Sequence, residues 1–262
     1  MDFIDDTGDE KDRNFVTALA RGLDLLRAFD PGDPELSNTD FAERTGLPKP
    51  TVSRMTHTLV KLDYLNLDER TGLYRLGPGV LKLGLNVLAS SEMADRARAP
   101  MKTVLEGPNP FVSVSLGHRH RDEAIYIAVE RSREVAALSL GVGASVPLFL
   151  SATGRVILIG LPEDVREATF EQADRKDPSR AQERRKAYLD AQSEYEHQGY
   201  VTGFGSWRKD VMGIAVPVFS LDPARAYGLN VGGHAFHVSA DELKHHYAEN
   251  LIAAGEKLSI KI

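Results

Sequence analysis

LSNTDFAERTGLPKPTVSRMTHTLVKLDYL, residues 36–65, contains the residue types that start and end helices, in an order that predicts two helices joined by a tight turn. Ser37, or the asparagine after it, can cap a short helix that we expect over 39–45. Gly46 can adopt the left-handed conformation that ends such a helix, and the prolines that follow can open a new helix without losing a needed N–H. The segment therefore predicts a short helix, a turn and another helix that runs to about Leu62.

The flanking segments add a helix in front and a hairpin behind. From Phe15 to Phe29, apolar residues recur at steps of three and four, which is the period of an amphipathic helix. Two short β-type runs, at 64–67 and 73–76, are separated by Asp-Glu-Arg-Thr-Gly, which is typical of a hairpin turn. Three helices followed by a β-hairpin describe a winged helix-turn-helix.

The third of these predicted helices has an apolar and a polar side when its residues are spaced by about 100° each. The apolar side consists of Val52, Met55, Leu59 and Leu62. The polar side consists of Pro50, Arg54, His57 and Lys61, flanked by Ser53 and Thr58. From Arg44 to Lys61 the chain carries four cations, the others being Lys49 and Arg54, and no acid.

A local gathering of cations suits DNA, although the net charge of −6 excludes a protein coated in basic surface. Phosphates attract cations, and base edges are read by arginine forks and small hydroxyl donors. Arg70 at the tip of the hairpin and Arg75 on its second strand can add contacts; the alternative for this whole face is ordinary solvation. The predicted DNA-binding residues are Lys49, Thr51, Ser53, Arg54, His57, Thr58, Lys61 and Arg70.

Composition sets the frame for the rest of the chain. A length of 262 residues predicts two domains, and 42% hydrophobic with 27% charged residues is typical of a globular protein. The chain has no cysteine, which excludes disulfides, thiolate catalysis and cysteine metal sites and suits a reducing cytoplasm. The acidic segment 1–14 lacks the apolar core of a secretory signal and is expected to be a disordered tail.

A helix expected over 78–91 exposes an apolar side, which favours a linker and dimerisation helix. Beyond it, strands alternate with helices, which indicates an α+β domain on a mainly antiparallel sheet. The strands are expected at 111–117, 123–130, 134–140, 211–219 and 226–233. The helices are expected at 92–106, 152–160, 163–171, 180–198 and 239–258. The uncharged stretch between Glu134 and Arg155 contains three glycines and a proline, which argues against a membrane span.

The sequence resembles the IclR-type bacterial transcriptional regulators over nearly its whole length. The likeness is carried by "RGLDLLRAF", the 36–65 segment and "YRLGPGVLKLG", then by "VPLFLSATGRVILIGLP", "YEHQGYVTGFGSWRKDVMGIAVPVF" and "YGLNVGGH". The resemblance implies homodimers or dimers of dimers that bind palindromic operators and respond to a small organic or aromatic acid. The implied α+β architecture is a tail at 1–14, a winged helix-turn-helix at 15–77, a linker helix at 78–91 and a GAF-like effector-binding domain at 92–262.

The resemblance places an effector pocket along 148–155, 213–218 and 229–234. Ser151 can cap the helix that starts near Ala152, so that the free N–H groups of Thr153 and Gly154 could receive a carboxylate. The implied effector-binding residues are Ser151, Thr153, Gly154, Val216, Asn230 and Gly232. The chain departs from the family pattern at Phe149 and Arg155, where a histidine and a lysine are usual, and at 203–206, where an acidic pair is common. Together with Trp207, that last change favours a larger or more aromatic effector; ordinary packing is the alternative for Trp207.

Two other functions compete with this interpretation. A metal-dependent enzyme could use the histidine pairs His118-x-His120 and His234-x-x-His237, but neither pair has a third ligand at fixed spacing. No phosphate loop, dinucleotide fingerprint or nucleophile elbow is complete, so we expect no catalysis and no cofactor. A constitutive DNA-binding protein, whose second domain fills its own pocket, stays open as the other alternative.

Overall fold

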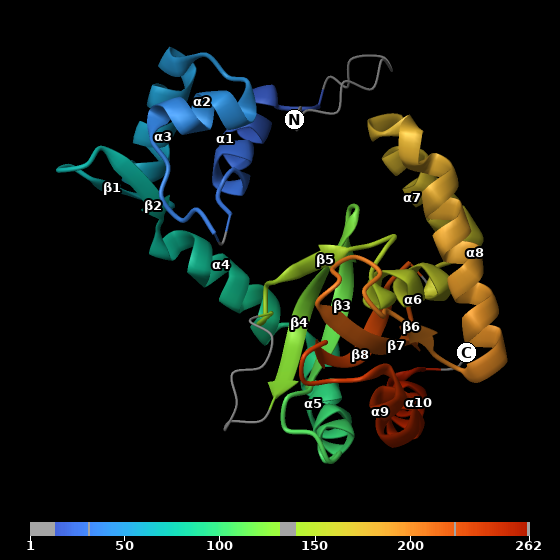
Figure 1. Ribbon diagram of the computed structural model, residues 1–262. Coiled ribbons are helices and arrows are strands. Elements are labelled where there is room, and N and C mark those ends of the chain that lie inside the picture. The colour runs from blue at the N-terminus through green and yellow to red at the C-terminus, as the bar shows by residue number, and fades with distance from the viewer. Residues whose placement is uncertain (1–13, 31, 132–139, 223, 261–262) are drawn as a thin grey trace. The chain divides into compact units, whose positions relative to one another are not determined.

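The computed structural model describes residues 14–30, 32–131, 140–222 and 224–260, and the chain divides into two compact units between Ser90 and Ser91 (Figure 1). All but one residue of the predicted tail at 1–14, and all but one of the predicted strand at 134–140, lie outside these described residues. Within them, no helix is both long and apolar enough to cross a membrane.

The first unit is a winged helix-turn-helix, as predicted. Its elements are α1 (Thr17–Arg27), α2 (Asn38–Thr45), α3 (Lys49–Lys61), the hairpin β1 (Leu65–Asp68) and β2 (Leu73–Leu76), and α4 (Pro78–Ala89). Ser37 caps α2 in a reciprocal capping box: its Oγ accepts the Asp40 N–H at 3.2 Å, and the Asp40 carboxylate accepts the Ser37 N–H at 2.7 Å. Gly46 ends α2 with a φ of 69°, so the predicted cap and turn are confirmed.

The core of this unit is built around Phe41, which is fully buried on α2. Its ring meets Phe29 edge-on at 5.4 Å between centroids and Tyr74 at 5.8 Å. The apolar side of α3 departs from prediction at its end, because Leu62 is 58% exposed. The helix stops at Lys61 and the chain turns at Asp63 with a φ of 60°, so Leu62 no longer follows the helical spacing.

The second unit is an α+β domain built on one antiparallel sheet in the order β5-β4-β3-β8-β7-β6. Its strands are β3 (Ser113–His120), β4 (Glu123–Arg131), β5 (Ser145–Pro147), β6 (Val201–Thr202), β7 (Val211–Phe219) and β8 (Ala226–His234). Its α-helices are α5 (Glu92–Leu105), α6 (Ala152–Gly160), α7 (Glu163–Lys176), α8 (Ala181–Gln198), α9 (Ala240–Glu242) and α10 (Ala248–Leu258). The single helix expected over 239–258 is interrupted by a π-helical turn, Leu243–Tyr247.

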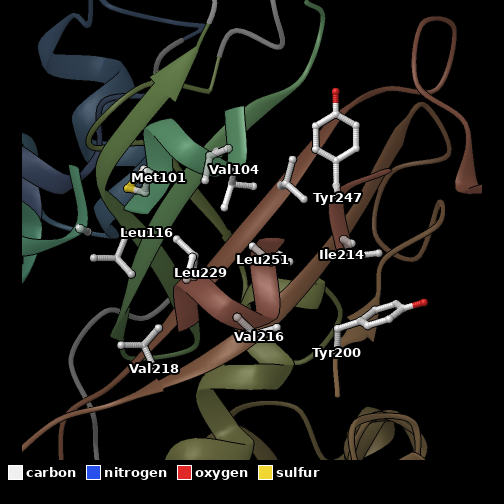
Figure 2. Packing of buried hydrophobic residues seen from close by; sticks show 14 of the residues in the cluster. Met101, Val104, Leu116, Tyr200, Ile214, Val216, Val218, Leu229, Tyr247 and Leu251 are labelled. Carbon is white, nitrogen blue, oxygen red and sulfur yellow. The ribbon is translucent and has the colours of Figure 1, made fainter. Parts of the chain in front are cut away.

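One face of this sheet is strongly apolar and packs against α5 and α10. Figure 2 shows Met101 of α5 and Leu251 of α10 in this core together with Leu116, Val216 and Leu229 of the central strands. Because side chains alternate along a strand, the residues between these positions belong to the opposite face. That face carries the cavity.

Candidate functional site

The exposed side of α3 carries most of the predicted DNA-contacting residues. Ser53, Arg54, His57, Thr58 and Lys61 are exposed, while Val52 is fully buried and anchors the helix on the core. Lys49 is also exposed and bonds the Thr39 hydroxyl at 3.2 Å; Thr51 is half-buried, and Arg70 is exposed at the hairpin tip. The arrangement presents cations and hydroxyl donors on one accessible helix face.

A polar contact that the sequence did not reveal fixes α3 in place. Thr56 lies fully buried on the inner side of the helix. Its hydroxyl lies 3.3 Å from Asn38 Oδ1 at the start of α2 and 3.4 Å from the Tyr74 phenol oxygen on β2. These contacts tie α3 to both the preceding helix and the hairpin. Thr56 was missed because its hydroxyl gives no signal in an apolar periodicity.

The cations of this unit divide into paired and unpaired groups. Arg44 pairs with Asp33 and donates to the Ala28 carbonyl at 2.8 Å, and Arg75 donates to Glu35 at 2.6 Å. Among the described residues, no carboxylate lies within ion-pair distance of Lys49, Arg54, Lys61 and Arg70, nor of Arg21 on α1 and Lys82 on α4. Four of the six unpaired cations among the described residues of this unit therefore lie on the exposed side of α3 or at the hairpin tip, and the suggested contact by Arg75 competes with its ion pair.

In the second unit, small residues on one sheet face leave room for a cavity. The strand register sets Ser115, Asn230 and Ala215 in one row across β3, β8 and β7. The next row, at Ser113, contains only glycines on the other two strands. Helix α6 approaches this face so closely that a Cβ at Gly228 would lie 2.6 Å from the Thr153 carbonyl oxygen. Gly228 thus allows the close approach of α6, and the rows of small residues at Ser115 and Ser113 form the cavity floor.

The N-terminus of α6 forms another wall. Ser151 caps the helix: its Oγ accepts the Gly154 N–H at 3.0 Å and donates to the Pro147 carbonyl at 2.7 Å. The prediction that Gly154 offers a free N–H is therefore wrong, and its α-carbon packs on Leu148, where a Cβ would come within 2.1 Å of the carbonyl oxygen. The N–H groups of Ala152 and Thr153, in the first turn, have no partner within the helix and lie at the cavity.

Within the described ranges, the lining of the cavity contains hydroxyls, an amide, glycines and apolar side chains, and no charged side chain. It consists of Ser113, Ser115, Tyr126, Leu140, Ser151, Ala152, Thr153, Gly203, Trp207, Val211, Met212, Gly213, Asn230, Gly232 and Gly233. Val216 is not among them: it pairs with Leu229 and belongs to the opposite core, beside Gly255 of α10. The prediction that Val216 lines the pocket is therefore wrong. Side chains alternate between the two faces of the sheet, and it is the neighbouring residue, Ala215, that faces the cavity side.

The side chains of Tyr126, Thr153 and Asn230 lie close together at the floor of this cavity. Tyr126 is buried on β4, and its phenol oxygen lies 3.4 Å from Thr153 Oγ1. Burial raises the pKa of Tyr126, while hydrogen bonds with Thr153 and Asn230 act against that rise. Sequence reasoning missed Tyr126 because nothing in its own segment marks it; only the sheet order brings β4 beside the helix that carries Thr153.

The segment after β6 closes the cavity on a further side. Arg155 of α6 donates to the Thr202 carbonyl at 2.6 Å, and Ser206 Oγ donates to the Leu150 carbonyl at 2.8 Å. These bonds hold Gly203 and Trp207 at the cavity, so Trp207 both packs in the neighbouring apolar cluster and contributes to the lining. Arg155, which stands where the family pattern has lysine, therefore supports the cavity wall through its hydrogen bond to Thr202 and is not one of the residues that line the cavity.

The histidine pairs take up separate roles. His118 packs on Tyr227, His234 lies 3.3 Å from Asp210, and His237 stacks on Phe111 at 4.0 Å between ring centroids. Over the described ranges, no three histidine or carboxylate groups are arranged to hold a metal ion.

A winged helix-turn-helix with unpaired cations on its exposed helix, followed by a second unit with a polar cavity, defines the class of DNA-binding transcriptional regulators. The family model "IclR helix-turn-helix domain" matches residues 18–69, and "Bacterial transcriptional regulator IclR C-terminal" matches residues 85–260. The chain therefore belongs to the IclR family, whose members are regulators and not enzymes.

Individual relatives agree with this assignment. The chain is 32% identical to the HTH-type transcriptional regulator TsaQ1/TsaQ2 of Comamonas testosteroni over 86% of this chain and 80% of that protein. It is 28% identical to the Pca regulon regulatory protein of Pseudomonas putida over 94% and 84%. A crystal structure of an IclR family transcriptional regulator from Brucella abortus is 35% identical, with a TM-score of 0.83 over 95% and 93% of the two chains.

Proposed function

We propose that this protein is an effector-responsive regulator that binds a palindromic operator as a dimer or dimer of dimers and senses a small organic or aromatic acid. The observation that carries the sensing part is the uncharged polar cavity between the small-residue sheet face and the start of α6. A carboxylate at the first N–H groups of α6 would meet both free donors and the positive end of the helix dipole. The effector-binding residues in this proposal are Ser151, Thr153, Asn230 and Gly232.

DNA binding is assigned to the exposed face of α3 and to the hairpin tip. Arg54, His57 and Ser53 are proposed to reach base edges, with Thr51 and Thr58 beside them. Lys49, Lys61 and Arg70 are proposed to contact phosphates, since Lys49 and Lys61 carry unpaired charges at the two ends of α3 and Arg70 carries one at the hairpin tip.

Dimerisation through the first unit is supported by an uncovered apolar surface. Helix α4 has no buried residue, and four of its apolar side chains are 52–64% exposed: Leu81, Leu83, Leu85 and Val87. Leu19 and Leu23 on α1 are also exposed, as are Phe15 and Val16 just before it. Such a surface is costly in water and is expected to be covered by a second copy.

An effector would act on the dimer by changing the distance between the two copies of α3. Two-fold proteins place their recognition helices about 34 Å apart, or at a multiple of that distance, to meet successive major grooves. The effector shifts DNA affinity only if it binds the DNA-competent and incompetent arrangements with different free energies.

Lys61→Ala is expected to weaken binding to all duplexes alike. If Lys61 neutralises one phosphate, its removal lowers the slope of log K against log salt by about 0.9. The measurement is fluorescence anisotropy with an operator selected from a random library and with an unrelated duplex, each over a range of salt. A loss confined to the selected operator would contradict the phosphate assignment.

The proposed function as a whole is tested by thermal unfolding of the full chain with a panel of carboxylic and aromatic metabolites. A ligand that binds only the folded state raises stability by RT ln(1 + [L]/Kd), so a dose-dependent rise in Tm is expected, accompanied by a change in operator affinity. A protein that binds operator but responds to no acid in the panel would instead be the constitutive regulator with a self-filled pocket.

A further inference from the structure

One polar atom in the cavity stands out because it has no partner. Asn230 Oδ1 is buried, and no donor among the described residues reaches it. A buried acceptor without a donor costs free energy, and native proteins leave few such groups. The unmet acceptor therefore needs an explanation.

The surroundings show why the protein itself does not satisfy this atom. Across the sheet, Asn230 stands between Ser115 and Ala215, and the adjoining row has glycine at 213 and 232. The glycines have no side chain that could donate, and the Ser115 hydroxyl does not come within hydrogen-bond distance. Asn230 is thus the longest side chain in these two rows, and it lines the cavity.

Tyr126 is a polar neighbour of this amide. Hydrogen bonding with Asn230 acts against the rise in the pKa of the buried Tyr126 phenol. The phenol lies beside Thr153 Oγ1 at 3.4 Å, which holds the ring in place. The Asn230 oxygen, which meets no donor among the described residues, is therefore the amide atom available to a ligand.

We propose that Asn230 Oδ1 selects an effector carrying a hydrogen-bond donor at this position, and that the ligand is a hydroxylated monocarboxylic acid. This inference rests on the proposed function, since it presumes that the cavity holds an acid. Among the described residues, the cavity lining has no cationic side chain to pair a second carboxylate and no carboxylate to pair an ammonium group. A neutral donor, a hydroxyl, is therefore the group that fits beside the amide, while the single carboxylate lies at the start of α6.

The test compares acids of one skeleton that differ by a single group. Benzoate, the three hydroxybenzoates and the three methoxybenzoates form one set; butyrate, 3-hydroxybutyrate and 3-methoxybutyrate form another. Calorimetric titration of the full chain is expected to show at least one hydroxy acid binding about tenfold or more tightly than its unsubstituted and methoxy partners, because only the hydroxyl donates.

Two variants localise the preference. Asn230→Ala is expected to bind the hydroxy acid no more than about threefold differently from its partners, since the acceptor is gone. Tyr126→Phe keeps the Asn230 oxygen and is expected to retain the hydroxyl preference. Thermal unfolding of each variant, and its DNA affinity without ligand, verify that both units are folded.

The outcomes separate the inference from the function on which it rests. Equal binding of all three members of a set, or preference for the methoxy acid, overturns the donor requirement and leaves the sensor intact. Hydroxyl preference that survives in Asn230→Ala overturns the assignment to Asn230. Binding of none of these acids, nor of any in the broader panel, overturns the acid sensor itself and the inference with it.

Discussion

Phe41→Ala is expected to unfold the first unit at a temperature where the second is still folded. The Phe41 ring is fully buried and meets both Phe29 and Tyr74, so its loss leaves a cavity between α2, β2 and the segment that follows α1. Truncation of a core phenylalanine costs about 3–5 kcal/mol, which is a large share of the stability of a small domain. Operator binding should be lost, while a ligand found in the thermal screen should still bind.

The measurement is calorimetric unfolding in parallel with DNA and ligand titrations. Phe236→Ala is the matched control, because Phe236 is 85% exposed and its removal should change the free energy of unfolding by no more than about 0.5 kcal/mol. If Phe41→Ala left the DNA affinity and the unfolding profile unchanged, the packing described for the first unit would be incorrect.

The first unit could be predicted almost completely because its signals are local. Ser37 and Gly46 mark the ends of α2 through caps that use neighbouring atoms, so the helix bounds follow from a few residues. Thr56 shows the limit of this approach: its burial depends on Asn38 and Tyr74, which lie 18 residues away on either side.

The second unit could be predicted in its longer elements and less well in its site. β5 and β6 have three and two residues, too few for any periodicity, and become strands only through their neighbours in the sheet. The placement of Val216 failed because a one-residue error in parity moves a side chain to the other face of a sheet. Tyr126 reaches the cavity through the strand order, which no local pattern contains.

The sequence alone also could not predict which of the cations near α3 are neutralised by ion pairs. A count of charges between Arg44 and Lys61 treats all four cations alike. The structure distinguishes them. Asp33, which lies outside that segment, pairs with Arg44, whereas the Arg54 side chain is exposed to solvent. The distinction matters for which arginine is free to meet DNA.

Arg54→Ala is expected to weaken binding to the selected operator by about 1–3 kcal/mol, the range for a bidentate contact with a base. Arg54 lies on the exposed face of α3, and the side chains around it are short, so its fork can extend into a major groove. Binding to an unrelated duplex should fall much less, since base readout adds little there.

Arg54→Lys separates the fork from the charge. Lysine keeps the positive charge but cannot make the planar two-bond contact, so affinity for unrelated DNA should be retained while discrimination between operator and unrelated DNA falls. Arg44→Ala serves as the comparison, because Arg44 is already paired with Asp33 and bonded to Ala28 and should change stability more than sequence discrimination. Anisotropy titrations of the three variants at one fixed salt concentration decide the matter: equal discrimination in wild type, Arg54→Ala and Arg54→Lys would remove Arg54 from base readout and leave it as a phosphate contact.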